Sequence, residues 1–266
     1  PVKQQRLQVT SIMRPTNGAM SKECDLLTED YVDDINEYLF DREGGHVVRV
    51  SFLSGKKVTE QMRSRLVDWI IRTHHKLYLR PDTLHLAVYI VDRYLEKADV
   101  EEEQLLLVGA CATLAAAKYE EVDCPEMEDL TQAIEGRIVQ VNDMLEMERE
   151  LVRATGFNLG RPHSTHFLRS FWMKAEGDAL SYCLAKYFSE ICLMISLFSS
   201  MRASLVAAGS LWLADHIKGK SVTTNKGTDV TIFLNAVMDS CRTGETIAYW
   251  VLRVRKEGNL KALGEK

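Results

Sequence analysis

The residues from about 103 to 119 constrain the fold most, because they predict a helix that is apolar on nearly every side. Its apolar residues are Leu105, Leu106, Leu107, Val108, Ala110, Cys111, Leu114 and Ala115 to Ala117. Such a helix must be covered by neighbours all round, so we expect it at the centre of a helical bundle. Its small residues would let the neighbouring helices approach closely.

Helical periodicity continues on both sides of this central segment. We expect helices over about 59–77, from Pro81 onward, after Pro125 and over 138–154, the last with Val141, Leu145, Glu148 and Val152 along one side. An earlier helix is expected after Thr28, which can cap it, and should stop at Gly44-Gly45.

A weak internal repeat divides the chain at the Gly- and Pro-containing linker 158–162. Ala87, Tyr89, Val108, Ala110 and Ala116 recur 98 residues later as Ala185, Tyr187, Val206, Ala208 and Ala214. We therefore predict a duplicated all-helical domain. The expected parts are a polar segment (1–27), an N-terminal helix and connection (28–56), a first domain (57–157) and a second domain (158–266), with a polar loop at 219–229 before two last helices.

Composition limits the classes of function. The chain has 266 residues, 46% of them hydrophobic, with only 5 Pro and 15 Gly, which allows a full core and argues against disorder. A net charge of −5 does not provide the basic surface that nonspecific DNA binding needs. No apolar run reaches the roughly 20 residues that span a bilayer. The start has neither a signal-peptide h-region nor an initiating Met, so we expect a piece of a longer chain.

The six cysteines predict free thiols in a reducing compartment, the cytosol or the nucleus. They form no C-x-x-C pair and no Cys/His cluster with zinc spacing; they are Cys24, Cys111, Cys124, Cys183, Cys192 and Cys241. The sequence also shows no Gly-rich phosphate loop, nucleophile elbow or paired catalytic acids. It therefore predicts no metal, no cofactor and no enzymatic site.

Two motifs carry a family resemblance. In the segment 62–70, Met62, Leu66 and Trp69 fall at i, i+4 and i+7 on one helical face, and Lys118-Tyr119-Glu120-Glu121 ends the central helix. These motifs resemble the cyclin box, most closely that of mitotic B-type cyclins. The five positions that mark the family's first box are all filled, by Arg63, Asp92, Leu107, Lys118 and Glu148. Segments 31–39 and 158–169 are similar to the B-type entries into the two boxes.

The resemblance implies an all-α fold with two tandem five-helix cyclin-box domains preceded by an N-terminal helix. It also implies a non-catalytic subunit, in nucleus and cytoplasm, that binds and activates a cyclin-dependent protein kinase and controls the G2/M transition and mitosis. In cyclins the residues matching Lys118 and Glu148 bind the kinase's regulatory helix and its flanking backbone. Tyr119 would be an aromatic anchor, and Ala115, Ala116 and Ala117 a low surface for a partner helix. On sequence alone, Lys118 could equally be a solvated lysine that complements a helix C-terminus.

The resemblance gives Arg63 and Asp92 a structural role, as an ion pair that locks two helices of the first box together. It gives the Met62–Leu66–Trp69 face the role of a groove for Arg-x-Leu peptides, although these side chains could instead face the core. Arg65 and Arg72 replace an aliphatic residue and an acidic or amide residue of the family's groove. Because two cations would repel the peptide's arginine, we hypothesise weakened Arg-x-Leu docking and a preference for acidic or phosphorylated peptides.

A second docking site is implied in the second box, where B-type cyclins have a small basic pocket for phosphorylated motifs. Arg169 and Lys186 match two of its positions, and Tyr182 stands where histidine is usual. An arginine can grip phosphate bidentately and a lysine adds a point charge. The two cations could equally be ordinary solvated charges.

The expected partners are a mitotic-type cyclin-dependent kinase and docking peptides of its substrates or inhibitors, with no membrane and no direct nucleic acid contact. The alternative is a cyclin-fold transcription factor that binds DNA and polymerase machinery. That function requires a basic face and a zinc ribbon, and this acidic chain shows no ribbon.

Overall fold

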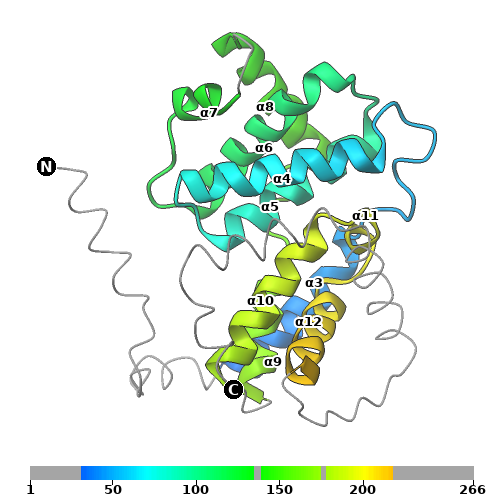
Figure 1. Ribbon diagram of the computed structural model, residues 1–266, viewed down its shortest axis with the longest axis vertical. Helices are drawn as coiled ribbons and strands as arrows, with labels where there is room; N and C mark the ends of the chain where they lie inside the picture. The colour runs from blue at the N-terminus through cyan, green and yellow to red at the C-terminus, as the bar shows by residue number, and fades with distance from the viewer. Residues whose placement is uncertain (1–30, 135–138, 175–177, 218–266) are drawn as a thin grey trace, which may run out of the picture. The chain divides into compact units, whose positions relative to one another are not determined.

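The computed structural model describes residues 31–134, 139–174 and 178–217. Within these ranges every regular element is a helix, which confirms the all-α prediction (Figure 1). The chain divides after Leu39 into two units, and α3 (Val32–Glu43) spans that division. The predicted tail 1–27, the Thr28 cap, the 219–229 loop and the two last helices lie outside the described residues. No helix in the described part of the chain is long and apolar enough to cross a membrane.

The first repeat is a bundle around one central helix. Its members are α4 (Glu60–Lys76), α5 (Pro81–Lys97), α6 (Leu105–Glu120), α7 (Met127–Ala133) and α8 (Val141–Thr155). Short 3-10 turns, η2 (Gly44–His46) and η3 (Glu102–Gln104), precede α4 and α6. Helix α6 packs against α4, α5 and α8, and its residues from Val108 to Ala117 are all buried. The apolar segment is therefore the centre of the bundle, as predicted.

Local sequence fixes where α4 begins and how closely it approaches α6. The Thr59 side chain accepts a hydrogen bond from the backbone N of Met62 at 3.2 Å, which caps α4. At Gly109 of α6, a Cβ atom would lie only 2.7 Å from Cδ1 of Leu66. The missing side chain at Gly109 therefore allows the two helices to pack in contact.

Helix α8 presents a different face to the core from the one that the sequence suggested. Its buried residues are Met144, Met147, Leu151 and Thr155, whereas Val141 is exposed. The expected stripe through Leu145 and Glu148 lies beside this face and is only half-buried. Two methionines take the core positions because their flexible side chains fill irregular space, and the expected stripe did not include them.

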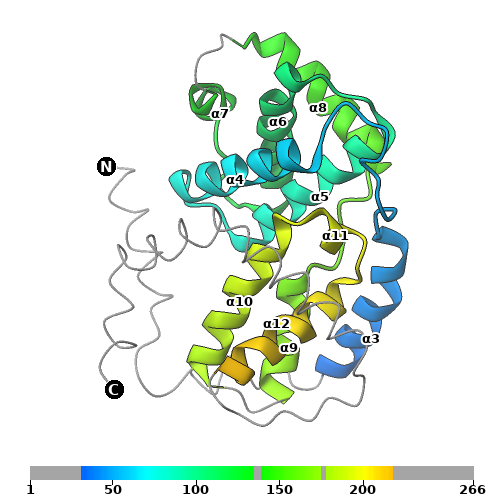
Figure 2. The ribbon, with the colours of Figure 1, turned by 45° about the vertical axis from the view of Figure 1, so that its right-hand side comes forward.

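The second repeat copies the two central helices of the first. It consists of α9 (Ser164–Lys174), α10 (Ala179–Leu193), the single turn α11 (Ser196–Ser199) and α12 (Ala203–Ile217). Helix α10 begins 98 residues after α5, and α12 begins 98 residues after α6. Helix α12 packs against both α9 and α10 (Figure 2). This constant offset confirms the predicted duplication.

The end of α3 attaches to the second repeat. The Phe40 ring lies 5.1 Å from that of Phe167 in α9, between ring centroids. The buried Glu43 carboxylate accepts hydrogen bonds from the backbone N and the hydroxyl of Ser204, at 2.9 and 2.8 Å. The chain therefore contacts the second repeat before it enters the first.

Candidate functional site

The predicted kinase-binding residues Lys118 and Glu148 meet at one end of the first repeat. Lys118 lies in the last turn of α6, and Glu148 lies in the middle of α8, which packs against α6. Nζ of Lys118 is 2.5 Å from Oε1 of Glu148, and the lysine remains about half exposed. The pair is therefore formed within the chain and is open to a partner from one side.

Three exposed apolar side chains lie at or just after the ends of the two helices that carry this pair. Tyr119 is 54% exposed, Val122 98% and Phe157 74%. Tyr119 adjoins the segment that follows α8, because its hydroxyl oxygen would be 3.0 Å from a Cβ atom at Gly160. Sequence analysis named Tyr119 but missed Val122 and Phe157. The signal available was an apolar residue two positions after the end of each of two helices, where loops are usually polar.

Phe157 is held in an unfavourable backbone conformation. Gly156 ends α8 in the left-handed region with φ 65°, and Phe157 follows with φ 59°. Left-handed φ is common for glycine but costs other residues roughly 1–2 kcal/mol. The sharp turn holds an aromatic ring in solvent instead of folding it onto the core.

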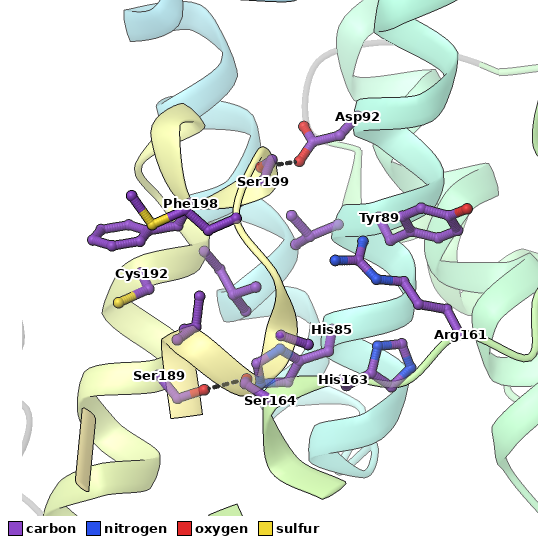
Figure 3. A pocket seen from close by; sticks show the side chains of 15 residues that line it. His85, Tyr89, Asp92, Arg161, His163, Ser164, Ser189, Cys192, Phe198 and Ser199 are labelled. Atoms are coloured by element: carbon purple, nitrogen blue, oxygen red, sulfur yellow. Dashed lines mark hydrogen bonds between the residues drawn. The ribbon is translucent and has the colours of Figure 1, made fainter. Parts of the chain in front are cut away.

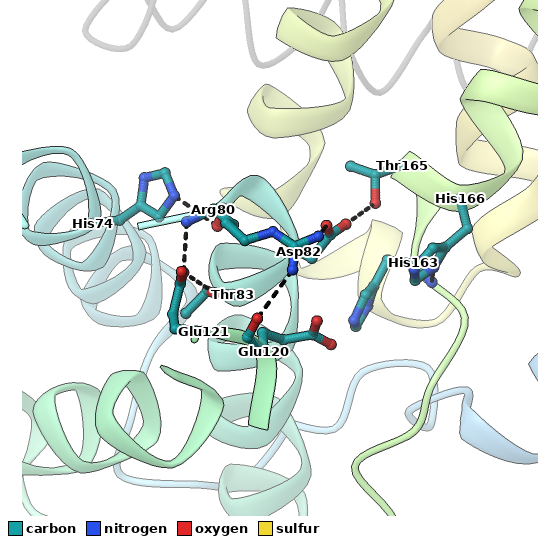
Figure 4. Close-up of polar contacts among 9 residues, drawn as sticks. All are labelled: His74, Arg80, Asp82, Thr83, Glu120, Glu121, His163, Thr165 and His166. Atoms are coloured by element: carbon teal, nitrogen blue, oxygen red, sulfur yellow. Dashed lines mark hydrogen bonds and ion pairs between the residues drawn. The ribbon is translucent and has the colours of Figure 1, made fainter. Parts of the chain in front are cut away.

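A polar network fixes the segment that follows Lys118 (Figure 4). The Glu121 carboxylate accepts hydrogen bonds from the backbone N of Arg80 at 2.6 Å and from the Thr83 hydroxyl at 2.5 Å. Nη1 of Arg80 donates to the backbone oxygen of Glu120 at 3.0 Å. The connection between α4 and α5 therefore anchors the chain between Tyr119 and Val122.

The alanines expected to form a low surface for a partner helix are not available to a partner. Ala115 is only 3% exposed, and Ala116 and Ala117 are fully buried. Helix α6 is central, so its own neighbours α4, α5 and α8 already occupy the space beside its small residues. The contact of Ala115 with a kinase stays a prediction, and the free chain exposes almost no surface of Ala115 for it.

The predicted groove on α4 is only partly a surface. Leu66 is 2% exposed and packs against Gly109, so it belongs to the core and not to a groove. Met62 and Trp69 are half-buried, and Nε1 of Trp69 donates to the backbone oxygen of Ala133 at 3.3 Å. A peptide could reach Met62 and Trp69 but not Leu66.

The two arginines that depart from the family's groove differ in their surroundings. Arg65 is exposed on α4. Arg72 is also exposed, but its Nε lies 3.0 Å from a carboxylate oxygen of Asp68, one turn earlier. Because Asp68 offsets the charge of Arg72, the added positive charge that distinguishes this groove from the family's groove comes mainly from Arg65.

The three residues of the predicted phosphate pocket come together in the second repeat. Nζ of Lys186 lies 5.6 Å from the centre of the Tyr182 ring, one turn away on α10. Burial raises the pKa of Tyr182, and the positive charge of Arg169 on α9 lowers it in part. Arg169 is exposed and Lys186 half-buried, so both cations remain accessible. Whether they bind phosphate stays a prediction.

Arg63 and Asp92 form a buried ion pair whose contacts extend beyond the first repeat. Nε and Nη2 of Arg63 each lie 2.6 Å from an Asp92 carboxylate oxygen. Arg63 also donates to the Leu193 backbone oxygen and to the Ser199 hydroxyl, both at 3.0 Å. Ser199 in turn donates to Asp92 at 2.6 Å (Figure 3). These four residues form what we call the seam cluster, because they join α4 and α5 to α10 and α11.

The described part of the chain holds no cluster of metal-ligating side chains, and two of its thiols have raised pKa values. Among the residues that the structure describes, no group of three or more His, Cys, Asp or Glu side chains could hold a metal ion. Cys124, near the Lys118–Glu148 pair, is a free thiol whose pKa is raised by burial and by Glu148, although Lys118 lowers it. Burial raises the pKa of Cys111 to about 12. Both thiols therefore stay protonated near neutral pH.

Two family models match successive parts of the chain. The model described as "Cyclin, N-terminal domain" matches residues 34–160, and "Cyclin, C-terminal domain" matches residues 162–241. Two solved structures share the fold. A viral cyclin from herpesvirus saimiri aligns with a TM-score of 0.65 at 16% identity, over 79% of this chain and 95% of its own. A chain of the yeast RNA Pol II CTD kinase CTDK-1 complex aligns with a TM-score of 0.56 at 15% identity, over 63% and 58%.

Sequence relatives point to one branch of the same family. A G2/mitotic-specific cyclin-B of Spisula solidissima is 35% identical over 196 residues, covering 74% of this chain and 46% of the relative. A G2/mitotic-specific cyclin-B2 of Oryzias luzonensis is 39% identical over 188 residues, covering 71% and 48%. The chain therefore spans about half the length of these curated relatives. Together with the two domain matches and the duplicated helical fold, these similarities show that the chain belongs to the cyclin family.

Proposed function

We propose that this chain is a non-catalytic regulatory subunit that binds and activates a cyclin-dependent protein kinase of the mitotic type and acts at the G2/M transition. The two relatives described as G2/mitotic-specific cyclins support this assignment. The ATP and all catalytic groups would belong to the kinase, and the cyclin would supply binding energy.

The observation that carries the proposal is the Lys118–Glu148 ion pair, with exposed apolar residues at or just after the ends of the same two helices. We call these five residues the kinase-binding surface: Lys118, Tyr119, Val122, Glu148 and Phe157. It combines an ion pair with three exposed apolar side chains. Binding interfaces commonly have aromatic anchors that become buried within a polar rim. Val122 and Phe157 would gain favourable burial only when a partner covers them.

Phe157 provides a second reason for placing the partner here. Its left-handed backbone and its exposed ring both lower the stability of the free chain. Strain of this kind tends to occur where function requires a particular geometry. A kinase that buries the ring would remove its unfavourable contact with water.

Activation then follows as a shift between two kinase conformations. A protein kinase is active only when a lysine–glutamate ion pair and the metal-binding groups are in place, and movement of its regulatory helix controls that pair. A cyclin that binds one position of this helix more tightly shifts the population toward it. The rigid bundle behind Lys118 and Glu148 would present a fixed template for that helix.

Two surfaces away from the kinase are proposed to bind docking peptides of substrates or inhibitors. Met62 and Trp69 would offer apolar contacts beside the exposed Arg65, which favours acidic or phosphorylated peptides over Arg-x-Leu peptides. Arg169 and Lys186, with Tyr182 between them, would bind a phosphorylated residue. We also propose a location in nucleus and cytoplasm, which the free thiols Cys111, Cys124, Cys183 and Cys192 support.

The test is to mix the purified chain with monomeric cyclin-dependent kinases and to measure histone phosphorylation. The proposal predicts activation that depends on Lys118 and Glu148. Retention on promoter DNA that falls with salt, without any effect on a kinase, would instead support the transcription-factor function.

A further inference from the structure

A cavity of about 50 Å³ lies in the seam between the two repeats (Figure 3). In such a cavity each water-sized group takes roughly 10–15 Å³, so it has room for about three to five of them. Its lining combines apolar residues, among them Val88, Leu193, Phe198 and Val206, with polar residues, among them His85, Arg161, Ser164 and Ser189. The volume of about 50 Å³ suits a group of four or five heavy atoms.

Arg161 brings a positive charge to this cavity. Figure 3 shows its side chain reaching from the linker across the Tyr89 ring, and Cζ lies 4.4 Å from the ring centre. Among the residues that the structure describes, no carboxylate lies within 4.0 Å of this guanidinium, the distance of an ion pair. Arg161 is half-buried, and the resulting loss of water lowers the pKa of its guanidinium, a shift that the charges of Asp92 and Glu43 oppose in part. The cation–π contact offsets only part of that loss.

His85, which also lines the cavity, has a buried ring nitrogen. The side chain is 6% exposed, and its Nε2 is buried without a hydrogen-bond partner among the residues that the structure describes. Burial is the main reason why the pKa of His85 falls to about 3, so the ring is neutral near pH 7. In the tautomer with hydrogen on Nε2, the ring can donate to an acceptor in the cavity.

The nearby hydroxyls add a third donor. The oxygens of Ser164 and Ser189 are 2.6 Å apart, so one hydroxyl donates to the other. The accepting hydroxyl then has its own hydrogen free to donate. The one carboxylate on the cavity wall, Asp92, is already engaged by Arg63 and Ser199. Its charge is therefore largely neutralised and does not exclude an anion.

We propose that this seam cavity binds a phosphate-sized oxyanion, held by the Arg161 guanidinium and by donors from His85 and the Ser164–Ser189 pair. Arginine is the side chain best suited to bidentate contact with such a group. The ion would join the linker to α5 and α10, and so would stiffen the junction between the two repeats. The proposal does not depend on kinase binding, because none of these residues belongs to the kinase-binding surface.

The experiment is a calorimetric titration of the whole chain in a phosphate-free buffer, first with inorganic phosphate and then with a short peptide that carries one phosphoserine. We expect saturable binding of at least one probe. Arg161→Gln should weaken that binding by roughly tenfold or more, since a charge-assisted hydrogen bond is lost. Whichever probe loses affinity in this variant identifies the source of the oxyanion, a free ion or a phosphorylated chain.

Two further variants keep the test decisive. Arg161→Lys preserves the charge but loses the paired N–H donors of the guanidinium, so it should bind the oxyanion more weakly than the wild type does. This variant keeps the test open if Arg161→Gln does not fold. Arg169→Ala removes a cation from the other predicted phosphate pocket and should leave Arg161-dependent binding unchanged. No saturable binding of either probe, or binding that the Arg161 variants leave unaltered, would show that the cavity holds only water.

Discussion

Nη1 of Arg63 donates a hydrogen bond to the backbone oxygen of Leu193 at 3.0 Å, across the seam between the two repeats. The same guanidinium is held by Asp92 of its own repeat and contacts Ser199 of the other. The ion pair that the resemblance assigned to the first box therefore also joins the boxes. Any loss of Arg63 should affect both repeats together.

Arg63→Ala should strongly destabilise the chain. It leaves the buried Asp92 carboxylate without its cation, and breaking a buried pair in this way costs about 3–5 kcal/mol. The free energy of unfolding, measured by urea denaturation with circular dichroism, should fall by that amount.

Arg72→Ala is the matched control for this loss. Arg72 pairs with Asp68 on the surface of the same helix, and an exposed i, i+4 pair contributes only about 0.3–0.5 kcal/mol. Equal losses from the two variants would contradict the structural role of the seam cluster.

The free energy of unfolding should decrease as the pH is lowered, because His85 is buried as a neutral ring. Burial lowers its pKa to about 3, an effect that the charge of Asp82 opposes and those of Arg161, His166 and His74 reinforce. Below about pH 6.5 the unfolded chain takes up a proton at this position and the folded chain does not, so acid favours unfolding. The slope can reach about 1.4 kcal/mol per pH unit.

His85→Gln tests this pH dependence. Urea denaturation at pH 7.0 and pH 5.0 should show a smaller loss of stability in the variant than in the wild type. His166, whose pKa is also lowered chiefly by burial, should account for part of the remaining loss. An identical loss in wild type and variant would show that His85 is not buried as a neutral ring.

Phe157→Asn should stabilise the free chain and weaken kinase binding. Asparagine tolerates the left-handed backbone that strains phenylalanine, so the free energy of unfolding should rise by about 0.5–1 kcal/mol. Kinase affinity should fall by roughly tenfold or more if the ring is an anchor. The opposite signs of the two effects distinguish an interface residue from a core residue.

Tyr78→Asn is the control for the stability gain, because Tyr78 is also exposed with φ 55°. It should raise the free energy of unfolding by a similar amount. If Phe157→Asn destabilises the chain or leaves kinase affinity unchanged, Phe157 does not belong to the kinase-binding surface.

Arg65→Ile should strengthen the binding of an Arg-x-Leu peptide to the face of α4 beside Met62 and Trp69. It removes an exposed charge that repels the peptide's arginine and restores apolar surface. Adding Arg72→Gln should contribute less, because Asp68 already offsets the charge of Arg72. Fluorescence titration of one labelled peptide against both variants measures the difference. Equal affinity of wild type and Arg65→Ile/Arg72→Gln would refute the altered preference.

The fold could be predicted because its signals are local. An apolar helix around Val108 has to be central, Pro81 has to lie in a first helical turn, and two copies at one offset have to share an architecture. The face of α8 escaped prediction because Met144 and Met147 fill the core as well as branched residues do.

The candidate site was less predictable because it depends on tertiary arrangement. The approach of Lys118 to Glu148 could be expected only from family resemblance, since nothing in a single sequence pairs residues 30 positions apart. The burial of Ala115 could not be predicted, because sequence shows that a residue is small but not what already covers it. The contact of Arg63 with Leu193 uses a backbone oxygen, which no side-chain pattern can indicate.

The central claim is that a kinase binds the chain at Lys118 and Glu148. The direct measurement is kinase pull-down and histone phosphorylation with the double variant Lys118→Ala/Glu148→Ala, beside Lys57→Ala/Glu101→Ala, which removes another exposed ion pair. The first should lose kinase binding and activation with an unchanged circular dichroism spectrum, and the second should retain both. Wild-type binding and activation by Lys118→Ala/Glu148→Ala would contradict the proposed function of this surface.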